Sequence, residues 1–302
     1  MSTARTASAP GSIMITGEHA VVQGYPAIVA AIAQRVTVRL REVAGGALSI
    51  TSEIAPPQTV SLDALVAEGL YRFVIAAVAW HGMEFAGLEI DIRSDIDPTL
   101  GLGSSAAVTV AALAALRGAA PDALHADALA IIRALQGRGS GADLAASLRG
   151  GCLAYEVGDS ATFGPLPLPP ALSLFNVGYK TPTGEVLARV AAAQAEDPAR
   201  YDALYAQMGA SAAETIARVQ SDGWRTVGDD IARYQDLMAD LGVSDAQLDA
   251  AIATARSTEC VIGAKISGSG LGDCVVALGA VPPGFVPVTL DQKGAVVHDD
   301  AS

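Results

Sequence analysis

A glycine- and serine-rich loop that runs straight into an apolar segment constrains this chain most. The loop reads Gly101-Leu102-Gly103-Ser104-Ser105, and the Ala- and Val-rich run from Ala106 to Leu116 follows it. Glycines let backbone N–H groups approach a ligand closely, and Ser104 or Ser105 is a candidate N-cap for a helix. Free N–H groups at a helix start form an anion site. An ordinary glycine turn with a serine cap is the alternative, and the loop alone does not decide.

Three further segments place polar groups beside glycines. Glu18 and His19 follow a strand predicted at residues 13–15, and Asp143 follows the turn Gly137-Arg138-Gly139-Ser140-Gly141. A second glycine loop, residues 267–272, lies between two predicted strands. Taken singly, a core histidine and a first-turn acid explain His19 and Asp143 as well as a site does. Taken together, a phosphate cradle, a metal-binding hydroxyl and a carboxylate are what phosphoryl transfer requires. The chain has no Gly-Lys-Ser/Thr, so the first loop is not a Walker A loop.

Composition narrows the class of protein. With 302 residues, 51% of them hydrophobic, the chain is predicted to be globular with an ample core. A net charge of −13 argues against a nucleic-acid partner. The apolar run Ala106 to Leu116 is too short to span a bilayer, so no membrane partner is expected. Residues 1–9 do not resemble a secretory signal, which predicts a cytoplasmic location. The three cysteines are widely spaced and are expected to be reduced thiols.

Alternating and helical hydrophobic patterns predict a mixed architecture. Strands are expected at residues 36–40, 48–51, 88–92, 172–177, 261–266 and 274–278, and helices at 62–80, 105–116, 126–135 and over much of 185–256. The proline-rich stretch Gly164 to Pro170 is the best candidate for a boundary between lobes. Strands and helices follow no regular βαβ order, which favours an α+β fold.

The three glycine segments resemble, in order, the three motifs of the GHMP kinases (galactokinase, homoserine, mevalonate and phosphomevalonate kinases). The resemblance runs from Ala9 to about Leu278. It implies a two-lobe α+β GHMP kinase fold, with an ATP-binding N-terminal lobe like ribosomal protein S5 domain 2 over residues 1–165. A ferredoxin-like α+β C-terminal lobe would follow over residues 166–302, with ATP between the two.

The same resemblance implies a role for each matching residue, with ATP and Mg²⁺ as cofactors. The phosphates would be wrapped by Gly101, Leu102, Gly103, Ser104, Ser105 and Ala106, and the ATP pocket completed by Gly268, Ser269 and Gly270. Asp143 and Ser105 would be catalytic, Ser105 also as the Mg²⁺ ligand. The acceptor would be faced by Glu18, His19, Arg138, Ser140, Lys180 and Thr183.

Two departures bear on the acceptor. Mevalonate kinases usually carry a lysine where Ser12 stands, and a glutamate ligand of Mg²⁺ in the region where this chain has Ile131-Ile132. An alcohol must lose a proton as it attacks, whereas a phosphate monoester is already largely dianionic and needs cations instead. Arg138, Lys180 and Lys265 are candidates for those cations. The second and third motifs also look more like those of phosphomevalonate kinases.

These points favour phosphorylation of phosphomevalonate to diphosphomevalonate in the mevalonate pathway of isoprenoid biosynthesis. Mevalonate itself is the alternative acceptor. The two departures are also what a catalytically degenerate nucleotide-binding or sensing module would show, so this third interpretation stays open. The sequence leaves a homodimer open as well.

Overall fold

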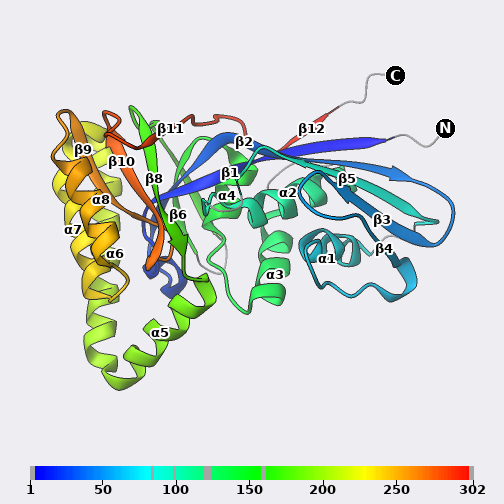
Figure 1. Ribbon diagram of the computed structural model, residues 1–302, viewed down its shortest axis with the longest axis horizontal. Helices are drawn as coiled ribbons and strands as arrows, with labels where there is room; N and C mark the ends of the chain where they lie inside the picture. The colour runs from blue at the N-terminus through cyan, green and yellow to red at the C-terminus, as the bar shows by residue number, and fades with distance from the viewer. Residues whose placement is uncertain (1–3, 83–84, 98–99, 119–123, 158–160, 299–302) are drawn as a thin grey trace.

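Two β-sheets, each covered by helices, divide the molecule into two lobes (Figure 1). The computed structural model describes residues 4–82, 85–97, 100–118, 124–157 and 161–298. Residues 98 and 99 of the loop before Gly101 therefore lie outside the described part. Within the described part, no helix combines the length and the apolar character needed to cross a membrane.

The first sheet has the strand order β12-β1-β2-β5-β3-β4, and a β6–β7 hairpin joins it at β2. Its strands are β1 (Arg5–Thr16), β2 (Ala27–Glu42), β3 (Ala47–Ser52), β4 (Gln58–Ser61), β5 (Leu88–Ser94), β6 (Cys152–Glu156), β7 (Thr162–Leu166) and β12 (Val296–His298). The long β2 pairs with β6 near its start and with β5 over its second half. The last strand, β12, returns to the first lobe and pairs with the outer edge of β1.

The second sheet has the order β11-β8-β10-β9. Its strands are β8 (Leu172–Lys180), β9 (Val261–Ser267), β10 (Gly272–Gly279) and β11 (Val286–Val288), and the chain between them forms α5 (Thr183–Glu196), α6 (Pro198–Asp222), α7 (Gly228–Asp240) and α8 (Ala246–Arg256). Figure 1 shows α6, α7 and α8 stacked on the outer side of this sheet. Strands grouped in sheets and helices grouped in layers confirm the predicted α+β class.

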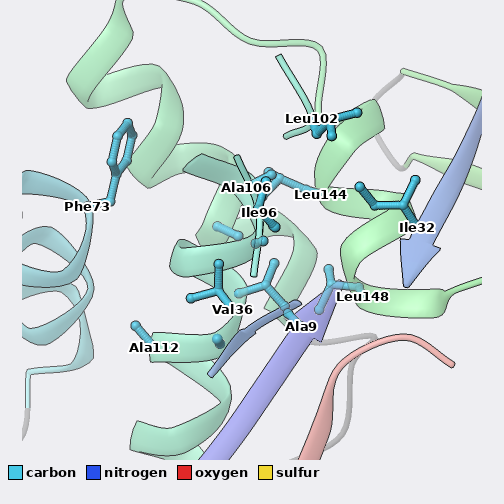
Figure 2. Packing of buried hydrophobic residues seen from close by; sticks show 14 of the residues in the cluster. Ala9, Ile32, Val36, Phe73, Ile96, Leu102, Ala106, Ala112, Leu144 and Leu148 are labelled. Atoms are coloured by element: carbon cyan, nitrogen blue, oxygen red, sulfur yellow. The ribbon is translucent and has the colours of Figure 1, made fainter. Parts of the chain in front are cut away.

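Helices α2 (Ser104–Arg117) and α4 (Ala142–Arg149) pack against the first sheet, and α1 (Arg72–His81) and α3 (Leu124–Gln136) pack against α2. The α2 helix is buried on nearly every side, because its Ala and Val side chains allow close approach to β1 and β2. Figure 2 shows Leu102 and Ala106 packed beside Ile96 and Leu144. This packing anchors the loop before α2 to the core and fixes where the helix begins.

The helix predicted over residues 62–80 is wrong in its first half. Only Arg72–His81 is α-helical, and residues 62–64 form a single 3-10 turn. Gly69 has φ +71, a conformation that interrupts a right-handed helix. The other predicted strands and helices are present, but β1 and β2 begin at Arg5 and Ala27, well before the starts predicted at residues 13 and 36.

Candidate active site

Strand β1 and the glycine loop before α2 meet at a bulge in the strand. The pairing of β1 with β2 shifts register between Pro10 and Ser12, and at this point the Ser12 N–H donates to the Leu102 carbonyl over 3.1 Å. A Cβ on Gly11 would lie 2.6 Å from the same carbonyl oxygen. Glycine is therefore required at position 11 for the two backbones to touch.

The hydroxyl of Ser12 connects this bulge to Asp143. Ser12 Oγ donates a hydrogen bond of 2.8 Å to Asp143 Oδ1. Gly103, with φ +67, lies directly beside it: a Cβ there would be 2.1 Å from Ser12 Oγ. The contact thus brings together three segments that are distant in the sequence, and it needs a residue without a side chain at position 103.

The start of α2 is open to a ligand. Gly103 occupies the N-cap position, and as a glycine it has no side chain that could accept a capping hydrogen bond from the first turn. The expectation that Ser104 or Ser105 caps the helix is wrong, because both lie inside its first turn. Their N–H groups and that of Ala106 precede the first intrahelical donor, Ala107, whose N–H bonds to the Gly103 carbonyl. Uncapped first-turn amides at the positive end of a buried helix are suited to bind an anion.

Leu102 contributes to this region through its backbone. Its side chain is buried in the core beside Ala106, and its carbonyl accepts the Ser12 N–H (Figure 2). Only its backbone is therefore available to the phosphates that the loop is predicted to wrap, and this contact stays a prediction. Its side chain instead anchors the loop.

Asp143 lies in the first turn of α4, which begins after the Ser140-Gly141 turn. Two side chains hold that turn: Tyr155 Oη donates to the Ser140 carbonyl over 2.6 Å, and His125 Nε2 lies 3.1 Å from the Gly141 carbonyl. Sequence reasoning missed both residues, which come from separate elements. Protein atoms packed around Asp143 raise the pKa of its carboxyl group, and the Ser12 hydrogen bond lowers it by less. Part of the side chain nevertheless stays exposed, so the carboxylate is accessible.

The third glycine segment faces the turn after β1. His19 Nε2 lies 2.9 Å from the Ser269 carbonyl oxygen, which only accepts, so Nε2 carries the proton. Burial lowers the pKa of His19 and so favours the neutral form of the ring. Its Nδ1 is buried without a hydrogen-bond partner among the described residues, as are Thr16 Oγ1 and Ser269 Oγ. Buried polar atoms without partners are unusual, and a polar ligand bound at these two segments would account for them.

Glu18 has a structural partner beneath this turn. Its carboxylate forms a buried ion pair with Lys265, and Tyr234 Oη donates to the Glu18 carbonyl over 2.8 Å. Burial raises the pKa of Glu18 and lowers that of Lys265, while the opposite charge of each partner acts the other way. Lys265 is fully buried, so the expectation that it supplies a cation to an acceptor is wrong. Contact of Glu18 and His19 with an acceptor stays a prediction.

The remaining predicted acceptor residues come from both lobes. Lys180 ends β8 and pairs with Asp273, Thr183 begins α5 and is exposed, and Arg138 is exposed in the turn before α4. Ser140 Oγ accepts from the Ala142 N–H over 3.3 Å and so helps to start α4. Contact of these residues with an acceptor stays a prediction.

A pocket of about 380 Å³ lies next to the start of α2. Ser104 and Ser105 line one side, and Tyr71, Ile54 and Leu70 line an apolar side, with Ile54 and Leu70 largely exposed. Apolar walls beside an anion site suit the base and the phosphates of a nucleotide. These apolar residues come from irregular segments between β3 and α1, where no periodic pattern indicated a site.

The described residues contain no group of three or more His, Cys, Asp or Glu side chains arranged to hold a metal ion. Ile131 and Ile132 are buried, and a Cβ on Gly139 would lie 2.9 Å from Ile132 Cγ2, so an apolar contact fills that region. If a magnesium ion arrives with the phosphates of ATP and its own water ligands, Ser105 in the first turn of α2 is the side chain predicted to bind it. This agrees with the reluctance of Mg²⁺ to lose its water.

Residues 67–151 match the family described as GHMP kinases N terminal domain, and residues 215–282 match GHMP kinases C terminal. The mevalonate kinase of Aeropyrum pernix is 30% identical over 294 residues, covering 92% of this chain and 89% of its own. The chain belongs to the GHMP kinases. As a GHMP kinase it is an ATP-dependent enzyme of the group that acts in the mevalonate pathway, and its two-lobe α+β architecture is that of the superfamily.

Two other relatives help to define this GHMP kinase. The phosphomevalonate kinase of a Streptomyces species is 31% identical over 185 residues, but this covers only 51% of this chain and 50% of its own. The crystal structure of L. major mevalonate kinase in complex with R-mevalonate has a TM-score of 0.75 and 23% identity, and covers 96% of both chains. That structure supports the shared fold.

Proposed function

We propose that this GHMP kinase phosphorylates mevalonate, giving 5-phosphomevalonate and ADP. The observation that carries the proposal is the accessible Asp143 carboxylate, held by Ser12 beside the open start of α2. An alcohol acceptor needs a base at this place, because its proton must leave as it attacks phosphorus. The relatives that span nearly the whole chain and carry the name mevalonate kinase support the same choice.

In the proposed reaction the hydroxyl oxygen of mevalonate forms a bond to the terminal phosphorus of ATP. The bond from that phosphorus to the bridging oxygen breaks, ADP leaves, and the hydroxyl proton passes to Asp143. The first-turn amides of α2 hold the phosphates and stabilise the charge that develops on their oxygens. Magnesium would add charge neutralisation, with Ser105 as its protein ligand.

Mevalonate thereby replaces phosphomevalonate, the acceptor favoured by the sequence motifs. A phosphorylated acceptor needs cations, yet Lys265 is buried against Glu18. The phosphomevalonate kinase relative from Streptomyces matches only about half of this chain. That partial relationship and the partly exposed Lys180 keep phosphomevalonate as the second candidate.

An acceptor panel tests the proposal. Purified protein with ATP and Mg²⁺ is assayed for ADP release on mevalonate, phosphomevalonate and homoserine, with an acceptor-free reaction as background. We expect turnover on mevalonate with a kcat/KM at least tenfold above that on the other two. A preference for phosphomevalonate would reinstate the second candidate. ATP binding without turnover on any acceptor would instead favour the nucleotide-binding module.

The division at residues 165 and 166, the cytoplasmic location and a homodimer remain predictions. The return of β12 to β1 means that the segment after Thr289 packs with the first lobe, although it lies in the second predicted range.

A further inference from the structure

The carboxylate of Asp273 lies between the two glycine loops of the site. Asp273 is buried and has φ +72, an unusual conformation for a residue with a side chain. A Cβ on Gly101 would be 2.6 Å from its Oδ1, and a Cβ on Gly268 would be 2.8 Å from its Oδ2. Both loops therefore need glycine to admit this carboxylate. The strained backbone and the two close approaches mark Asp273 as a specifically accommodated residue.

Asp273 fixes the position of Lys180. Lys180 Nζ lies 3.3 Å from Oδ1 and 3.2 Å from Oδ2 of Asp273, and a Cβ on Gly101 would be 3.1 Å from the same nitrogen. The ammonium group thus lies directly against the loop that leads into α2. The Lys180 side chain is 34% exposed, whereas that of Asp273 is 4% exposed. The Asp273 side chain is therefore buried in the protein, while the Lys180 side chain is accessible to solvent.

The other cations expected at the site are less well placed. Lys265 is fully buried and bonds to Glu18 and to the Ile266 carbonyl. Arg138 is exposed in the turn before α4. Position 12, where mevalonate kinases usually carry a lysine, holds the neutral Ser12 beside Asp143. The phosphates of ATP carry several negative charges that a transferase must offset during transfer. Among these candidates, Lys180 alone is both held against the phosphate loop and accessible.

We propose that Asp273 is a positioning residue that holds the Lys180 ammonium against Gly101, where Lys180 contacts the phosphoryl group being transferred. An ammonium group has three donors, so it can bond to a phosphate oxygen while it keeps a contact with Asp273. This role rests on the proposed function, since it assigns a cation to the same reaction.

Kinetics of four variants test the role. Lys180→Met removes the cation, Asp273→Asn removes its anchor with little change of shape, and the double variant leaves no unpaired charge. Lys293→Met, at an exposed lysine outside the site, is the matched control. We expect kcat to fall about 100-fold for Lys180→Met, as for loss of one group that stabilises developing charge. For Asp273→Asn we expect a fall of roughly tenfold, because the cation remains but is less well placed.

The double variant separates positioning from a merely structural effect. If Asp273 acts through Lys180, the double variant falls no further than Lys180→Met alone, and KM for mevalonate stays within about threefold of wild type. Losses that multiply to about 1000-fold would overturn the positioning role. A kcat within twofold of wild type for Lys180→Met would overturn the catalytic one, and Lys293→Met should stay within that range.

Nucleotide binding provides a readout that does not depend on the acceptor. We expect Lys180→Met to weaken binding of a non-hydrolysable ATP analogue about tenfold while ADP affinity stays within twofold, because only the analogue carries the terminal phosphate. Equal effects on both nucleotides, or no effect on either, would count against the contact. If wild-type protein turned over no acceptor, the proposed function would fail, and this binding comparison alone would decide the role of Lys180.

Discussion

Ser12 donates a 2.8 Å hydrogen bond to Asp143, although 131 positions separate the two residues in the chain. The bond joins the first strand of the protein to the first turn of α4 beside the N-terminus of α2. It orients the one carboxylate that our proposal uses as a base. It also favours the charged form of that carboxylate, which opposes the effect of burial.

Replacing Ser12 by alanine should change the pH dependence of the reaction. Asp143 must be deprotonated to accept a proton, so kcat/KM falls as the pH drops through its pKa. Without the Ser12 hydrogen bond the pKa of Asp143 rises further, and the acid limb of the kcat/KM profile moves to higher pH. Ser8→Ala, which alters a buried serine on the same strand away from Asp143, should leave the limb in place. An acid limb unmoved by Ser12→Ala would contradict the pairing.

Asp143→Asn should abolish most turnover while the protein stays folded. Loss of a positioned general base costs about 10²- to 10⁴-fold in rate. Binding of an ATP analogue should persist, since the α2 amides are untouched. Steady-state kinetics with mevalonate, with calorimetry of analogue binding as control, give both values. Near-normal turnover would remove the catalytic role of Asp143.

Gly103→Ala should inactivate the enzyme more than an equivalent change at the other end of α2. A Cβ at position 103 would lie 2.1 Å from Ser12 Oγ, so either the loop or Ser12 must move. Gly118 also has positive φ, but a Cβ there meets no atom within 4 Å. Both variants place a side chain at positive φ, which destabilises the fold by about 1 kcal/mol. Only Gly103→Ala should also lower kcat by tenfold or more. Equal kinetic effects at the two positions would show that the clash is unimportant.

Glu18→Gln should strongly destabilise the fold. It leaves the buried Lys265 ammonium without its partner, a loss of about 3–5 kcal/mol in the free energy of unfolding. The double variant Glu18→Gln with Lys265→Met removes both charges and should recover part of this loss. Glu214→Gln breaks an exposed pair with Arg233 and should cost less than about 1 kcal/mol. Urea denaturation compares the variants, and a double variant no more stable than Glu18→Gln would argue against an unpaired charge as the cause.

Local sequence patterns predicted the α+β class and most elements because alternation and helical spacing follow from burial on one face. The β5 strand alternates buried and exposed residues as its sequence requires. The segment 62–80 failed because its apolar spacing looks helical, while Gly69 takes a left-handed conformation that spacing does not reveal. Contacts with the rest of the fold, and not local spacing, determine the structure of this segment.

The candidate site was predictable where glycines crowd together and unpredictable where distant residues support them. The glycines of the loops at 101–103 and 268–270 stand out in the sequence, and the resemblance to the GHMP kinase motifs provided their predicted roles. The contacts of His125 and Tyr155 with the carbonyls of the Ser140-Gly141 turn, by contrast, depend on which helix and strand pack behind that turn. The burial of Lys265 likewise depends on a partner 247 residues away. No local pattern carries that information.

The pairing of β12 with β1 has a consequence for how the protein is made. Thr6 pairs with His298, so a ribosome finishes the first strand long before it synthesises the neighbour that covers its outer edge. Until then, nascent chains carry a strand edge with unpaired N–H and C=O groups, a template for pairing between copies. Slow translation over the last quarter of the message would prolong that exposure, and chaperone capture of unfinished chains would shorten it.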